Sequence, residues 1–125
     1  MSLECQRPDI VIKPLMKKCF PNLICGIYTN DHAPNCQDSF KDYVIGSFIE
    51  LDKDLWEYTI DRDGWSAIHP KVEIFGNQIS YGYAVYTKKN ILLWAERFNF
   101  VLKPEKDGKV VDQWSLELTL VFKLN

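Results

Sequence analysis

The sequence lacks the features of membrane and secreted proteins. It contains no apolar run of about eighteen residues, the length that a membrane-spanning helix needs. It also lacks an N-terminal basic segment followed by an apolar stretch and a small-residue cleavage site. We therefore expect no membrane partner and a cytoplasmic location.

The chain has little excess charge of either sign. Fifteen basic and seventeen acidic residues are mixed along the sequence, and the formal net charge is -2. No basic stripe is available to attract phosphate backbones, so we expect no nucleic-acid partner.

Metal-binding residues are few. The four cysteines contain no CxxC pair, and only two histidines are available to complete a metal site. Two disulfides are possible on count alone, but the absence of a signal peptide favours reduced thiols that behave as small hydrophobic side chains. We expect no metal and no cofactor. The residues concerned are Cys5, Cys19, Cys25, Cys36, His32 and His69.

The sequence is rich in material for a hydrophobic core. Hydrophobic residues make up 46% and aromatic residues 14% of its 125 residues. A chain of this length can build one core and is too short for two. No internal repeat, low-complexity tract or linker interrupts it, so residues 1–125 are predicted to form a single domain.

The first half of the sequence has helical or irregular patterns. Asp9–Phe20 is compatible with a short helix, and Thr29–Asn35 has the composition of an exposed loop. Ser39 followed by Asp42 resembles a capping box, and apolar residues then recur at helical spacing as far as Leu55. This pattern predicts an amphipathic helix of about four turns that begins at Ser39.

After residue 55 the period of the hydrophobic pattern becomes two, which is typical of β-strands. The pattern predicts an antiparallel sheet whose consecutive strands pair across short turns. The predicted turns are Asp63-Gly64, Gly76-Asn77, Lys88-Lys89-Asn90 and Pro104–Gly108. The predicted strands are Trp56–Ile60, a segment around Val72 and Ile74, Ile79–Tyr86, Ile91–Lys103 and Val110–Leu124.

The turns also predict a register between the strands. Pairing across each turn places even-numbered residues beside even-numbered residues. Gly82 then lies across from Glu96, and Glu96 lies near Leu116 on its other side, with an error of about one or two residues. The same arithmetic places Asp112 near Phe100.

Three segments of the C-terminal half carry a resemblance to a known superfamily. They are Val72–Asn77, Arg97–Leu102 and Asp107–Trp114, which include a Phe-rich strand, a DGK turn and a strand that begins with an acidic and an aromatic residue. Following a helix-rich N-terminal portion, this arrangement resembles the nuclear transport factor 2-like (NTF2-like) superfamily, which includes the SnoaL-type polyketide cyclases. The resemblance implies an α+β fold in which N-terminal helices pack on a curved antiparallel sheet to form a cone. It also implies a pocket inside the cone, an acidic residue there that sometimes works with a histidine, and a homodimer.

Glu96 interrupts the apolar stripe of the strand over residues 91–103 and is the first candidate for chemistry. A carboxylate in apolar surroundings costs several kcal/mol unless it is paired, hydrogen-bonded or protonated, and such a group can act as a general acid or base. An ion pair, or a strand that reaches solvent at this point, explains the same pattern. Asp112 and His69 are the other catalytic candidates, although exposed positions near loops also explain both.

Four aromatic residues and one glycine are candidates for contact with a small molecule. Large aromatic side chains on strand faces either line a pocket or fill a core. A glycine beside Trp94 and Glu96 either leaves room for a ligand or marks a bulge in the sheet. The candidate ligand-binding residues are Trp56, Gly82, Trp94, Phe98 and Trp114.

Three functions agree with these patterns. The first is a pocket domain that binds a small, mostly apolar molecule, with acid–base chemistry at a carboxylate in the sheet as an option, so whether the protein is an enzyme stays open. The second is a protein-binding module such as an immunity or inhibitor protein, which requires a filled core and an acidic, aromatic surface. The third is a small lipid-binding β-barrel capped by the helix that begins at Ser39.

Overall fold

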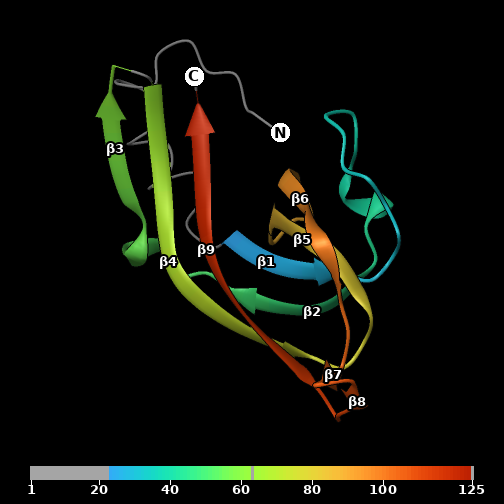
Figure 1. The fold of residues 1–125 in the computed structure, drawn as a ribbon. Coiled ribbons are helices and arrows are strands. Elements are labelled where there is room, and N and C mark those ends of the chain that lie inside the picture. The colour runs from blue at the N-terminus through green and yellow to red at the C-terminus, as the bar shows by residue number, and fades with distance from the viewer. Residues whose placement is uncertain (1–22, 63, 125) are drawn as a thin grey trace.

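The computed structural model describes residues 23–62 and 64–124, and in this part of the chain the regular structure is almost all strand (Figure 1). The longer strands form two antiparallel sheets, one with the order β2-β1-β5-β6 and one with the order β3-β4-β9. Their bounds are β1 Leu23–Tyr28, β2 Ile45–Glu50, β3 Glu57–Asp61, β4 Gly64–Gly76, β5 Ser80–Thr87, β6 Leu92–Leu102 and β9 Trp114–Leu124. A short hairpin of β7 (Glu105–Lys106) and β8 (Lys109–Val110) lies between β6 and β9 along the chain.

The two sheets face each other and enclose the main core. β4 and β9 are paired and bend near their middle (Figure 1), and β4 also comes close to β2. Alternate residues of both sheets meet in one buried cluster, which includes Cys25, Ile27, Val85, Trp94, Ile74, Trp114, Leu120 and Phe122. No helix of the described residues is long and apolar enough to cross a membrane.

The predicted α+β fold, a cone of N-terminal helices packed on a sheet, is wrong for the described residues. The predicted helix that begins at Ser39 is replaced by a single-turn 3₁₀ helix η2 (Phe40–Asp42), strand β2 and a second 3₁₀ turn η3 (Lys53–Leu55). The predicted helix over Asp9–Phe20 lies outside the described residues.

A local conflict explains why the predicted helix does not form. The capping box is present, because the Ser39 backbone N–H donates to the Asp42 carboxylate at 2.8 Å, but the helical turn that it starts is not continued. Val44 and Ile45 are β-branched and Gly46 follows them, and these residues disfavour a helix. β2 pairs with β1 along its length, and this pairing outweighs the helical spacing of its apolar residues.

The pattern along the sequence did not predict β1. This strand lies between β2 and β5 and is almost fully buried. A short strand that is apolar on both faces shows no alternation, so periodicity alone does not separate it from a buried helical segment.

The later strands and turns agree better with the prediction. β3, β5, β6 and β9 occupy the predicted segments, and the Asp107-Gly108 turn has the two positive φ angles of a type I′ hairpin, +54° and +79°. Gly82 pairs with Arg97, one residue from the predicted partner Glu96. The predicted pairing of the last two strands is wrong, since β6 pairs with β5 and β9 pairs with β4. The β7–β8 hairpin carries the chain from one sheet to the other, so the predicted neighbours Glu96 and Leu116 are not strand partners.

A second, smaller core lies on the outer face of the four-stranded sheet. The loop over residues 29–44 covers this face, and its Phe40 ring packs against Tyr86 with centroids 4.6 Å apart. The buried members of this cluster are Tyr28, Tyr43, Ala84, Tyr86 and Ala95. The molecule therefore has three layers at this point, with the loop outside the two sheets.

Candidate functional site

The three predicted catalytic residues occupy different environments. Glu96 is exposed on β6, Asp112 is exposed between β8 and β9, and His69 is 2% exposed within β4. Within the described part of the chain, no hydrogen bond or ion pair joins any two of them. The structure therefore does not assemble them into one site.

Glu96 is connected to the core through one tyrosine. The Trp94 indole N–H donates to the Tyr83 hydroxyl at 3.4 Å, and the Tyr83 hydroxyl in turn donates to the Glu96 carboxylate. Burial raises the pKa of Tyr83, and the nearby carboxylate of Glu96 raises it further. The Tyr83 hydroxyl therefore keeps its proton at neutral pH. Glu96 is a surface carboxylate that accepts a hydrogen bond from this buried tyrosine.

His69 joins two elements through its ring. Its Nδ1 lies 2.9 Å from the carbonyl oxygen of Pro70, and its Nε2 lies 3.2 Å from the carbonyl oxygen of Asp52. A neutral imidazole donates from only one nitrogen, so only one of these contacts is a hydrogen bond in that form. The register of β4 shifts between His69 and Val72, which is a bulge that accommodates Pro70. His69 therefore sits where the bulge of β4 meets the start of η3.

The three tryptophans that were candidates for ligand contact lie in the core. Trp94, Trp114 and Trp56 are 3%, 5% and 7% exposed. The Trp56 and Trp94 rings meet edge to face at 6.4 Å between centroids, and Trp56 also meets the His69 ring edge to face at 5.1 Å. Phe98 is half-buried and packs against this cluster. Their packing fills space between the sheets.

Gly82 leaves room for a side chain of the protein itself. A Cβ atom at this position would collide with the Glu96 carbonyl oxygen and with the ring of Tyr28 on the neighbouring strand. The space beside Gly82 is occupied by the Tyr28 ring.

The loop over residues 29–44 is fixed by a hub that the sequence analysis missed. The hub is the Asp38 carboxylate, whose side chain is only 5% exposed. Its Oδ2 accepts hydrogen bonds from the Asn35 backbone N–H at 2.9 Å, from the Tyr43 hydroxyl, and from His32 Nε2 at 2.9 Å. Burial alone would raise the pKa of Asp38, but these hydrogen bonds outweigh it and hold the pKa below its usual value.

Further contacts tie the same loop to the sheet. The Asn30 side chain donates to the Asp42 carbonyl and accepts from the Val44 backbone N–H, both at 2.9 Å. The Tyr28 hydroxyl donates to the His32 carbonyl at 3.0 Å, and Asp31 forms an ion pair with Arg97 of β6. No spacing rule predicts these contacts, because they depend on how the loop folds back on itself.

A cavity of about 320 Å³ opens beside η3 and β3. The described residues that line it are Lys53 and Asp54 of η3, Trp56, and Tyr58 of β3. Lys53 and Asp54 are exposed, Tyr58 is half-buried and Trp56 is buried, so the cavity has an aromatic wall and a rim with charges of both signs. Trp56 is the one predicted ligand-binding residue among them.

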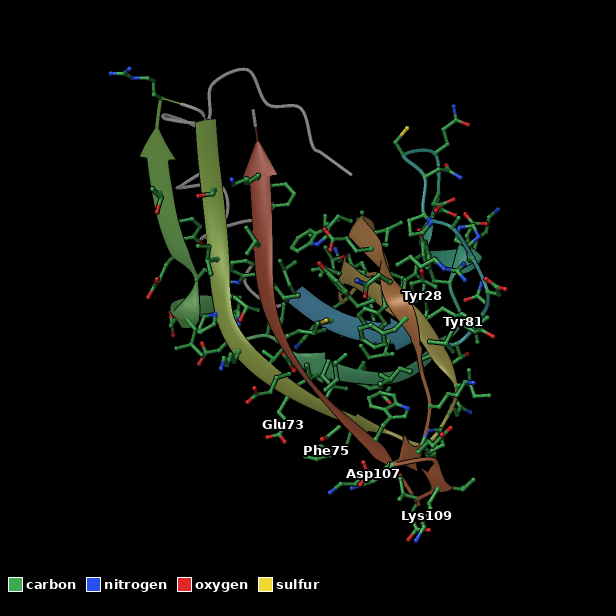
Figure 2. The ribbon with its side chains drawn as sticks, viewed as in Figure 1. Tyr28, Glu73, Phe75, Tyr81, Asp107 and Lys109 are labelled. Carbon is green, nitrogen blue, oxygen red and sulfur yellow. The ribbon has the colours of Figure 1, made fainter. Side chains whose placement is uncertain are left out.

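Exposed apolar side chains gather at one end of the molecule. We call Phe75, Ile79, Phe100, Val101 and Val110 the apolar end; they are 51%, 49%, 49%, 42% and 88% exposed. They come from the end of β4, the β4–β5 turn, the end of β6 and β8, which the pairing of Ser80 with Leu102 and of Gly76 with Trp114 brings together. In Figure 2 Phe75, Asp107 and Lys109 project outward at this end.

Among residues 23–62 and 64–124, no group of three or more His, Cys, Asp and Glu residues is arranged to hold a metal ion. No family model, curated protein or solved structure matches the chain. The resemblance to the NTF2-like superfamily therefore stays a prediction.

Proposed function

We propose that this chain is a protein-interaction module, that the apolar end is its contact surface, and that a second copy of the chain is the partner. One observation carries the proposal. Of the ten large hydrophobic side chains that are exposed in the described residues, five belong to the apolar end. A concentration of exposed apolar side chains at one end of a folded protein is typical of an interaction site.

Burial of these side chains supplies the driving force. Each is about half exposed or more, so covering it removes about 1 kcal/mol of unfavourable hydration per side chain. Val110 is the most exposed of the five and sits beside a tight turn, where it contributes nothing to the core described above. Its position is explained if it packs against another molecule.

The charges around the apolar end favour a protein partner over a nucleic acid or an anionic membrane. Lysines and acidic residues alternate along the exposed hairpin, which therefore has no strong field of one sign. A surface with both signs is complementary to a copy of itself turned about a twofold axis, because lysines of one copy can then meet carboxylates of the other. The residues concerned are Lys103, Glu105, Lys106, Asp107 and Lys109.

The packed core supports the same proposal. Trp56, Trp94 and Trp114 fill the space between the sheets, which is what an interaction module requires of its interior. The hub at Asp38 adds a fixed loop on the outer sheet face, and rigid scaffolds of this kind are common in binding modules.

Sedimentation velocity over a range of protein concentrations tests the proposal. The wild-type chain is expected to be a dimer, and the variants Val110→Lys and Phe75→Lys are expected to weaken association by about tenfold or more, since each removes an apolar contact twice in a symmetric dimer. The matched control is Phe48→Lys, which changes a side chain that is 67% exposed on β2. A wild-type chain that stays monomeric, or a Phe48→Lys variant that dissociates as readily as the other two, would overturn the proposal.

A further inference from the structure

The cavity beside η3 and β3 is independent of the apolar end. β3 pairs with the N-terminal half of β4, from Gly64 to Ile68, whereas Phe75 lies at the opposite end of β4. We propose that this cavity binds a small zwitterion that carries an aromatic ring, of the chemical class of an aromatic amino acid. The inference goes beyond the proposed interaction function.

The wall of the cavity is suited to a ring. Trp56 is 7% exposed, and edge contacts with His69 and Trp94 fix the orientation of its indole. Tyr58 continues the wall from β3. Aromatic side chains held in this way bind planar rings by stacking or edge contacts without losing side-chain freedom.

The rim of the cavity is suited to a zwitterion. Lys53 and Asp54 are consecutive residues of η3, and neither belongs to an ion pair within the part of the chain that the structure describes. A ligand with one ammonium and one carboxylate can pair with both, whereas a ligand of a single charge leaves one of them without a partner. A volume of about 320 Å³ fits one small molecule.

The rim is also held in place. The Asp52 side chain accepts a hydrogen bond from the Asp54 backbone N–H at 2.9 Å, which closes the start of η3. The Asp52 carbonyl oxygen accepts from the Leu55 N–H at 3.1 Å and lies 3.2 Å from His69 Nε2. The backbone of η3 therefore lies against β4 at His69, next to the aromatic wall.

Nuclear magnetic resonance titration tests the proposal. The indole N–H signal of Trp56, assigned with a Trp56→Phe variant, is followed while L-phenylalanine, phenylacetate, phenethylamine or glycine is added. We expect a saturable shift with phenylalanine, affinities about two- to fivefold weaker with phenylacetate and with phenethylamine, and no shift with glycine, because each exposed ion pair contributes up to about 1 kcal/mol.

Charge variants separate specific binding from general affinity for rings. Lys53→Gln is expected to weaken the binding of phenylalanine and phenylacetate by about two- to fivefold and to leave the binding of phenethylamine unchanged. Asp54→Asn is expected to weaken the binding of phenethylamine and to leave the binding of phenylacetate unchanged. The controls are Lys89→Gln and Asp31→Asn, exposed residues of the same charges on other loops, which should change no affinity. No saturable shift with any probe, or equal affinities for all three ring compounds in every variant, would overturn the proposal.

Discussion

The ring of Tyr28 lies directly over the backbone of Gly82 on the neighbouring strand. β1 and β5 pair at this point. The Tyr28 hydroxyl donates a hydrogen bond to the His32 carbonyl in the loop that covers this face of the sheet. A similar contact occurs at Gly26, which lies under the Tyr86 ring and Ile45. Glycine on these strands therefore makes room for the side chains that support the loop over residues 29–44.

Substitution of Gly82 is predicted to be the more damaging of two alanine substitutions. In Gly82→Ala the new Cβ meets the Glu96 backbone carbonyl, which cannot move without disturbing the β5–β6 pairing. In Gly26→Ala it meets only side-chain atoms, Ile45 Cγ2 at 2.8 Å and Tyr86 Cε1 at 3.0 Å, which can shift. We expect Gly82→Ala to lower the free energy of unfolding by about 1–3 kcal/mol and Gly26→Ala to lower it by less. Urea unfolding followed by tryptophan fluorescence measures both, and an equal or larger loss for Gly26→Ala would contradict this account.

The hub at Asp38 predicts a difference in stability between two variants of the same loop. Asp38→Asn removes a buried charge that accepts three hydrogen bonds, so we expect the free energy of unfolding to fall by about 1–3 kcal/mol. Asp31→Asn, in the same loop, removes a carboxylate whose side chain is 67% exposed and should cost less than about 1 kcal/mol. Both variants replace an aspartate of the same loop with asparagine, so the main difference between them is the burial and bonding of the carboxylate. Equal losses in the two variants would show that burial of Asp38 does not matter.

The stabilising effect of Asp38 should depend on pH. Its pKa in the folded chain is held below the ordinary value of 3.8, so its contribution is fully present at higher pH and is lost as the pH falls through the folded-state pKa. The difference in unfolding free energy between the wild type and Asp38→Asn is therefore expected to shrink as the pH falls below about 5. Urea unfolding of both proteins across this range tests the sign. A difference that grows as the pH falls below about 5 would mean that the folded pKa of Asp38 is raised.

Local chemistry predicted the strands whose patterns are complete in the sequence. β5, β6 and β9 alternate regularly, and the Asp107-Gly108 turn has a backbone conformation that few other dipeptides adopt, so these elements could be placed without the fold. β2 could not, because the capping box at Ser39 and the helical spacing after it are real local signals that pairing with β1 overrides. The predicted pairing of β6 with β9 was wrong for a related reason, since the sequence of a turn does not determine which sheet the next strand joins.

In the candidate sites, too, local patterns predicted some residues, and the fold brings others together in ways that the sequence did not predict. The cavity includes Trp56, which the alternation of its strand singled out, but Lys53 and Asp54 fall within the segment whose spacing predicted a helix, and the structure has the 3₁₀ turn η3 there. The hub unites His32, Asp38 and Tyr43 through a loop conformation that no spacing describes. Glu96 was selected because it interrupts an apolar stripe, and the structure accounts for it by exposure and by the Tyr83 hydroxyl.

The two described cysteines are predicted to differ strongly in reactivity. Cys25 is fully buried in β1, and burial raises the pKa of its thiol to about 12, whereas Cys36 is exposed in the loop over residues 29–44. The thiolate is the reactive form, so Cys25 lacks both the charge state and the access that alkylation needs. Its alkylation requires opening of the fold and should be slower than that of Cys36 by about a thousandfold or more.

Alkylation of the native protein with iodoacetamide, followed by peptide mass mapping, measures the two rates separately from those of Cys5 and Cys19. Cys36→Ser should abolish the fast signal of its own peptide and leave the slow rate of Cys25 unchanged. Urea at the unfolding midpoint should bring the rate of Cys25 close to that of Cys36, because the unfolded chain exposes both thiols equally. Rapid alkylation of Cys25 without denaturant would mean that β1 opens readily, which is incompatible with a central strand paired on both sides.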